Sequence, residues 1–156
     1  MNLRAADIVI VHGDGFFSRL IRRFSKKAEK VRATHVAIAV DSSRVVEALP
    51  KGVVVHAFNG SGRVYRARHL APVERLRIAE RALSYVGRPY GWSKILLHAI
   101  GLQRFASIDG YPICSWVLAG PYAGEGYTFG VDPSIATPDD IEDFVLARTD
   151  LYGEVK

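Results

Sequence analysis

The sequence predicts an α+β domain with an antiparallel sheet in the middle of the chain and helices before and after it. Short β-branched runs separated by turn residues occupy positions 34–69, and apolar residues at three- and four-residue steps lie on both sides of that segment. The 156 residues are 49% hydrophobic and 24% charged, which is typical of one globular unit with a core. We therefore expect a single domain over residues 1–156.

The N-terminal part predicts a buried strand followed by a helix. Asp7–His12 is the strand, and the turn Gly13-Asp14-Gly15 ends it. An apolar stripe at helical spacing then predicts a core-facing helix side. Its members are Phe17, Leu20, Ile21, Phe24, Ala28 and Val31.

Four further strands are expected before residue 70. They are Thr34–Val40, Arg44–Leu49, Val53–Phe58 and Arg63–His69. The three residues between the first two predict a hairpin, and turn residues separate the others. The pattern is that of an antiparallel meander.

A helix should begin at Pro72, which suits a first helical position, and end at Gly87 and Pro89. Its expected buried stripe is Leu76, Ala79, Leu83 and Val86. Later helices are expected over 92–100, from Tyr111-Pro112 to a stop at Gly120-Pro121, and after an irregular loop at the cap Thr137-Pro138-Asp139-Asp140.

The charge is basic and unevenly distributed. The net charge is +5 and the pI is about 9.5, which suggests an anionic partner. Many of the positive charges lie in the short segment 19–32, in which Glu29 is the only acidic residue. They are Arg19, Arg22, Arg23, Lys26, Lys27, Lys30 and Arg32. This segment either binds phosphate, lipid head groups or anionic cell-wall polymer, or is a solvated helix face. Nucleic acid is not expected, since no aromatic and basic interleaving or helix-turn-helix pattern occurs.

Several classes of protein are not indicated. The apolar runs are far shorter than the roughly 20 residues that cross a bilayer, and no signal peptide is recognised. We therefore expect a cytoplasmic protein, with release by lysis or dedicated secretion as alternatives. The single cysteine forms no intrachain disulfide, and no zinc motif is present, so no metal or cofactor is expected.

That cysteine, Cys114, falls in the first turn of a helix, at the third position if Pro112 is the first. The positive end of the helix dipole favours thiolate over thiol and lowers the pKa from about 8.5. Backbone N–H groups there have no partner within the helix and can hold an oxyanion. The alternative is a small buried hydrophobe beside Trp116 and Val117.

His35 is the best-placed base. Alternation puts His35 on the same strand face as Ala37 and Ala39, and these small neighbours leave room for a group above the ring. With a three-residue loop, Ala37 pairs with Glu47, so Glu47 shares that face one diagonal step from His35. Glu47 can then orient the ring. A loop of two or four residues would send it to the other face, where it is a surface acid.

His56 is the alternative base, although its alternation with Val54 and Phe58 favours a core-facing or edge position. The remaining histidines have no comparable context: His12, His69 and His98.

A series of motifs runs through most of the chain. In order they are Ala6-Asp7-Ile8-Val9, Thr34-His35-Val36-Ala37-Ile38, Val46-Glu47-Ala48, Gly87-Arg88-Pro89-Tyr90, Ile113-Cys114-Ser115 and Thr137-Pro138-Asp139-Asp140-Ile141. The series resembles the circularly permuted NlpC-like cysteine hydrolases of the YiiX/YebB-like group, which are papain-like and related to the lecithin-retinol acyltransferase group. In the unpermuted order the cysteine comes first, whereas here His35 precedes Cys114.

The resemblance implies a permuted papain-like fold, with an antiparallel sheet or partial barrel packed against helices. It matches Cys114 to the nucleophile, His35 to the base and Glu47 to the third polar residue. Peptide bonds in peptidoglycan and acyl bonds in lipids are the implied substrates, so a cysteine peptidase, amidase or acyl hydrolase is expected. The alternative is a non-catalytic binding module that docks on anionic envelope or lipid surfaces.

Overall fold

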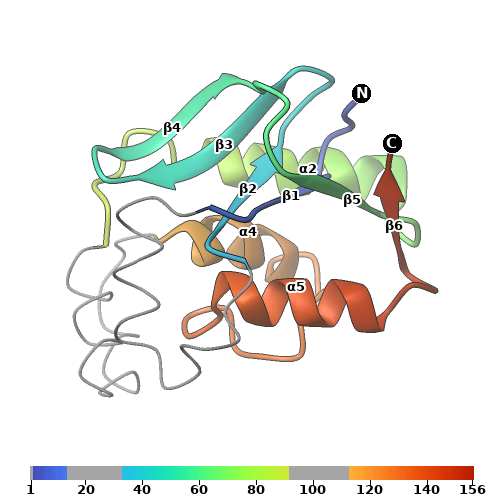
Figure 1. The fold of residues 1–156 in the computed structure, drawn as a ribbon. Helices are drawn as coiled ribbons and strands as arrows, with labels where there is room; N and C mark the ends of the chain where they lie inside the picture. Colours follow the sequence, from blue (N-terminus) through green and yellow to red (C-terminus); the bar gives the residue numbers. More distant parts are fainter. Residues whose placement is uncertain (1, 14–32, 92–112) are drawn as a thin grey trace.

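The computed structural model describes residues 2–13, 33–91 and 113–156 (Figure 1). The strands are β1 (Ile8–Val11), β2 (His35–Ala39), β3 (Arg44–Leu49), β4 (Gly52–Ala57), β5 (Arg63–Ala67) and β6 (Tyr152–Val155). The helices are α2 (Pro72–Leu83), α4 (Cys114–Ala123) and α5 (Pro138–Ala147). This is the α+β class that the sequence predicts. The expected helices around 17–31 and 92–100, and the basic segment at 19–32, lie outside the described residues.

In the described part of the chain, six strands form one antiparallel sheet in the order β4-β3-β2-β1-β5-β6. The expected meander is right for β2, β3 and β4 but wrong for β5, which pairs with β1 and β6 instead of β4. Gly62 explains how the chain returns to β1. It has a φ of +99°, and an added Cβ would lie 2.6 Å from the carbonyl oxygen of Ile10.

Strand alternation gives the sheet two apolar faces. One face, which includes Val36 and Ile38, packs against Ile78 of α2, Leu118 of α4 and Ile141 of α5. The other carries a smaller cluster of Leu3, Val9, Ala37, Ala39, Val45 and Val64. Helix α4 contacts both α2 and α5 and lies between them in Figure 1. The main core is therefore between the sheet and the helices.

Helix α2 is rotated relative to the predicted stripe. Ala79 is buried as expected, but the other three residues of the predicted stripe, Leu76, Leu83 and Val86, are exposed, and Ile78 and Ala82 are buried instead. Arg75 gives the reason, because its guanidinium turns inward to the backbone carbonyls of Ala5 and Ala67. These contacts set which side of the helix faces the sheet.

Arg75 also takes part in a buried ion pair. Asp7 is fully buried, and its carboxylate lies 2.6 Å from Arg66 of β5 and 3.7 Å from Arg75 of α2. A buried charge needs such partners. The pairs connect the start of β1 to β5 and α2.

The later helices follow their local signals in part. Thr137 caps α5 as expected, and its side chain and that of Asp140 also form a capping box. The predicted stop of α4 at Gly120-Pro121 is wrong, because the helix continues to Ala123 with Pro121 inside it and buried. Strand β6, which was not predicted, covers the edge of β5. None of the helices described here is long and apolar enough to cross a membrane.

Candidate active site

Cys114 is the first residue of α4, and Ile113, with extended backbone angles, is the N-cap. The predicted third position is therefore wrong, and the helix starts after Pro112, which lies outside the described residues. The first helical position still has the unpaired backbone N–H groups of a helix start. The thiol is 6% exposed and receives hydrogen bonds from the backbone N–H groups of Val36 and Ser115.

His35 lies between Cys114 and Glu47. Its Nε2 is 2.5 Å from Oε2 of Glu47, and its side chain is also hydrogen bonded to Cys114. Since Nε2 is engaged by the carboxylate, Nδ1 is the ring nitrogen that is left for the sulfur. The structure thus brings together the three residues that the sequence singles out.

The hairpin register explains how Glu47 reaches His35. Ile38 pairs with Val46, and Ala39 pairs with Val45, which is the register expected from a three-residue loop. No further β2–β3 pair is formed toward His35, although β1 stays paired with β2 up to that residue. The two strands therefore separate toward His35, and α4 packs against both of them.

The electrostatics of the site favour an ion pair between sulfur and imidazole. Burial opposes the thiolate, but the hydrogen bond and charge of His35 and the two backbone N–H groups lower the pKa of Cys114. Burial likewise opposes the imidazolium, but Cys114 and Glu47 raise the pKa of His35 to about 10. Both shifts favour the thiolate and imidazolium over the neutral thiol and imidazole.

The fold matches a known structure. The crystal structure of metalloprotein YiiX from Escherichia coli O157:H7 superposes with a TM-score of 0.62 and 18% sequence identity, over 99% of this chain and 89% of that chain. This chain has the fold of YiiX. No protein-family model matches the sequence, and no curated protein does. The likeness to YiiX confirms the expected fold, whereas the roles of individual residues rest on the geometry.

Within this YiiX-like fold, Glu47 has a second histidine partner. Nε2 of His56, on β4, lies 2.5 Å from Oε1 of Glu47. The β3–β4 register places Val45 opposite His56 and Val54 opposite Glu47, so His56 is a diagonal neighbour of Glu47 on the same face. Of the core-facing and edge positions expected for His56, the structure has the edge position, since β4 is an edge strand. The same parity argument that links Glu47 to His35 would have found this contact.

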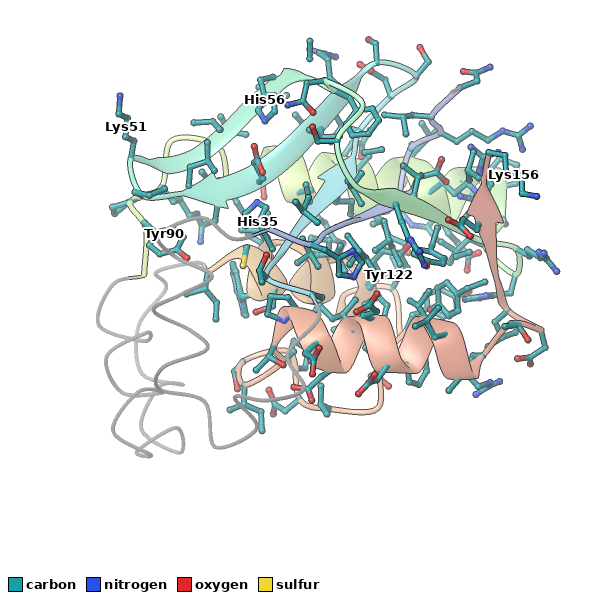
Figure 2. The ribbon with its side chains drawn as sticks, viewed as in Figure 1. His35, Lys51, His56, Tyr90, Tyr122 and Lys156 are labelled. Atoms are coloured by element: carbon teal, nitrogen blue, oxygen red, sulfur yellow. The ribbon has the colours of Figure 1, made fainter. Side chains whose placement is uncertain are left out.

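Tyr90 is a further residue at the site that sequence reasoning did not select. Burial, followed by the negative charge of Cys114, raises the pKa of Tyr90. Figure 2 shows Tyr90 and His35 near the start of α4. Two residues before Tyr90, the guanidinium of Arg88 lies over the ring of Tyr85. The ring of Tyr85 in turn packs against that of Trp116, with 4.6 Å between the ring centroids. Trp116 is two residues from Cys114 on α4, and residues with this spacing do not share a helix face.

The other histidines in the described residues are engaged elsewhere. Nε2 of His12 lies 2.7 Å from Oε1 of Glu142, and His69 packs between Tyr127 and Tyr152. Among residues 2–13, 33–91 and 113–156 there is no group of three or more His, Cys, Asp or Glu side chains arranged to hold a metal ion. The side chains of the site instead satisfy one another.

Proposed function

We propose that this protein is a cysteine hydrolase in which Cys114 attacks the carbonyl carbon of an amide or ester. The observation that carries the proposal is the chain of contacts from Cys114 through His35 to Glu47, at the start of a helix. A thiolate in that setting is a strong nucleophile at neutral pH. The lowered pKa of Cys114 and the raised pKa of His35 support this role.

The proposed reaction has two stages. In the first, Sγ of Cys114 bonds to the carbonyl carbon, and the displaced electron pair makes an oxyanion near the backbone N–H groups at the start of α4. His35 then gives its Nδ1 proton to the leaving nitrogen or oxygen as that bond breaks, which leaves a thioester. In the second stage, His35 takes a proton from water, and the hydroxide releases the acid and Cys114.

Glu47 has an orienting role in this scheme. Its Oε2 accepts the Nε2 proton of His35, which fixes the ring with Nδ1 toward the sulfur. The neighbouring negative charge stabilises the imidazolium that each stage requires. YiiX is described as a metalloprotein. In this chain each carboxylate oxygen of Glu47 is hydrogen bonded to a histidine nitrogen, and the proposed mechanism uses no metal ion.

Two substrate classes fit the proposal, peptide amides such as those in peptidoglycan and acyl esters of lipids. Both present the carbonyl that the mechanism needs, and both occur on anionic surfaces suited to a chain with a net charge of +5. Hydrolysis of muropeptides and of short acyl esters should be compared directly. Cys114→Ser, which keeps the shape but not the thiolate, is the control.

The decisive experiment is alkylation of the folded protein with iodoacetamide from pH 5 to 9. Because the chain has a single cysteine, every alkylation event reports on Cys114. We expect an apparent pKa well below 8.5 in the wild type and a rise toward 8.5 in His35→Ala. His12→Ala is the matched control, since it removes another histidine paired with a glutamate.

The opposite outcome has a clear meaning. If Cys114 reacts only after denaturation, the thiol is structural and the hydrolase proposal fails. The non-catalytic binding module would then be the better description.

A further inference from the structure

His56 is held by two hydrogen-bond acceptors. Its Nδ1 lies 2.8 Å from the carbonyl oxygen of Ala57, and its Nε2 lies 2.5 Å from Oε1 of Glu47. A carbonyl oxygen only accepts, so Nδ1 carries a proton. An unprotonated Nε2 would then set one acceptor against another. Both nitrogens of His56 are therefore protonated when Glu47 is ionised, and the ring is an imidazolium.

The four ionisable groups of the site have a net charge of zero when all of them are ionised. The Cys114 thiolate and the Glu47 carboxylate are negative, and His35 and His56 are positive. Each oxygen of Glu47 binds one of the two rings, Oε2 to His35 and Oε1 to His56. Without His56 the remaining three groups would carry one uncompensated negative charge. A partly buried ionised cluster is costly unless its charges are matched.

The electrostatic shifts agree with this assignment. Partial burial opposes the charge of His56, but the Ala57 carbonyl and Glu47 raise its pKa above the ordinary value. Burial opposes the charge of Glu47, but the two histidines lower its pKa. The ionisable groups that act on the His56 ring are Glu47 from β3 and His35 from β2.

We propose that His56 is a positioning residue for the reaction of Cys114: as an imidazolium it holds Oε1 of Glu47 and thereby aims Oε2 at His35. This inference rests on the proposed function and deepens it by adding a fourth member to the site. His56 does not touch the reacting atoms. It acts through Glu47, both by fixing the rotation of the carboxylate and by cancelling part of its charge.

These two actions can be separated by substitution. In His56→Ala the carboxylate loses its second partner and can rotate, and His35 also loses a positive neighbour. In His56→Gln the side-chain amide can still donate to Oε1, so orientation is kept while the charge is lost. His56 must stay protonated up to the pH at which His35 titrates, about 10, so both variants should raise the pH at which His35 loses its proton. Only His56→Ala should slow the chemistry strongly.

The test uses the full chain with two readouts. The first is the midpoint at which the imidazole of His35 loses its proton, followed through its nitrogen-15 chemical shifts. We expect a rise of about half to one pH unit in both His56 variants. The second is hydrolysis of p-nitrophenyl acetate at pH 7. Here we expect kcat to fall about tenfold in His56→Ala at unchanged KM, and less than about threefold in His56→Gln.

The matched control is His12→Ala. The side chain of His12 is 37% exposed and pairs with Glu142, whereas that of His56 is 39% exposed and pairs with Glu47. His12→Ala should leave both readouts unchanged.

The inference is overturned by a neutral His56 at pH 7 in the wild type. It is also overturned if the His35 midpoint in both His56 variants equals that in the His12 control, whatever happens to kcat. If His56→Ala does not fold, the midpoint in His56→Gln decides. Failure of the proposed function looks different: the wild type hydrolyses no ester and Cys114 reacts only after denaturation. The chemical shifts of His35 and His56 would still be measured in that case and judged by the same criteria.

Discussion

Glu47→Gln is the substitution that examines the site most directly. The variant keeps the size and shape of the side chain and removes the charge that faces two histidine nitrogens at 2.5 Å each. Both imidazolium rings lose their counter-charge. We therefore expect the pKa of His35 to fall from its wild-type value of about 10.

The size of that fall follows from Coulomb's law. Two unit charges about 4 Å apart interact by ~4 kcal/mol at an effective dielectric constant of about 20. The side chains of His35 and Glu47 are 23% and 15% exposed, so solvent screening reduces this value. Taking about half leaves ~2 kcal/mol, which corresponds to about 1.5 pH units. The His35 midpoint in Glu47→Gln should therefore lie near pH 8.5.

The assay follows the His35 imidazole by NMR between pH 5 and 11, together with alkylation of Cys114 by iodoacetamide. In the variant, the pH dependence of Cys114 alkylation should show no thiolate–imidazolium pair above about pH 8.5. Esterase activity at pH 7 should fall about 10- to 100-fold, because the ring is no longer held in one orientation. Glu142→Gln, which disrupts the pair with His12, is the control and should change none of these readouts.

The direction of the shift is the critical result. Glu47→Gln should lower the His35 midpoint, whereas the His56 substitutions should raise it. A midpoint that stays within a few tenths of a pH unit of the wild type, or that rises, would refute the assignment of Glu47 as the charged partner of His35.

Three further predictions concern stability. Asp7→Asn should lower the free energy of unfolding by about 3 kcal/mol in urea titrations, because it leaves two arginines without their buried counter-charge, whereas the surface-pair control Asp150→Asn should cost less than about 1 kcal/mol. Thr137→Ala should cost about 1 kcal/mol by the same assay, since it removes the cap of α5, and an unchanged stability would contradict the capping role. His35→Gln should be more destabilising at pH 6 than at pH 10.5. The raised pKa of His35 stabilises the fold fully below about 6.5, and this contribution is lost as the pH rises through about 10, so an equal cost at both pH values would contradict the ion pair.

The hairpin that carries the site could be predicted because its determinants are local. The Asp41 side chain accepts hydrogen bonds from the backbone N–H groups of Ser43 and Arg44, each at 2.8 Å, and this closes the three-residue loop. Loop length sets the register, and the register sets which residues share a face. Glu47 could thus be placed beside His35 from the sequence.

Other features depend on contacts between distant parts of the chain. The rotation of α2 follows from Arg75, whose partners Ala5, Asp7 and Ala67 precede the helix. The return of β5 to β1 depends on the close approach of Gly62 to Ile10. Apolar periodicity contains neither signal, because it reports only which side of an element is hydrophobic.

The surroundings of Cys114 show most clearly which features follow from local sequence and which follow from tertiary contacts. The sequence by itself determined that a lone thiol would lie near a helix start, that His35 and Glu47 would share a strand face, and that the domain would be α+β. Hydrogen bonds and side-chain periods within a few residues are enough for these conclusions. Only the tertiary structure decided that Cys114 is the first residue of α4 and that β2 and β3 separate toward His35, with α4 packed against both strands. These depend on how separate elements meet in space, and a pattern read along one chain does not encode the distance between them.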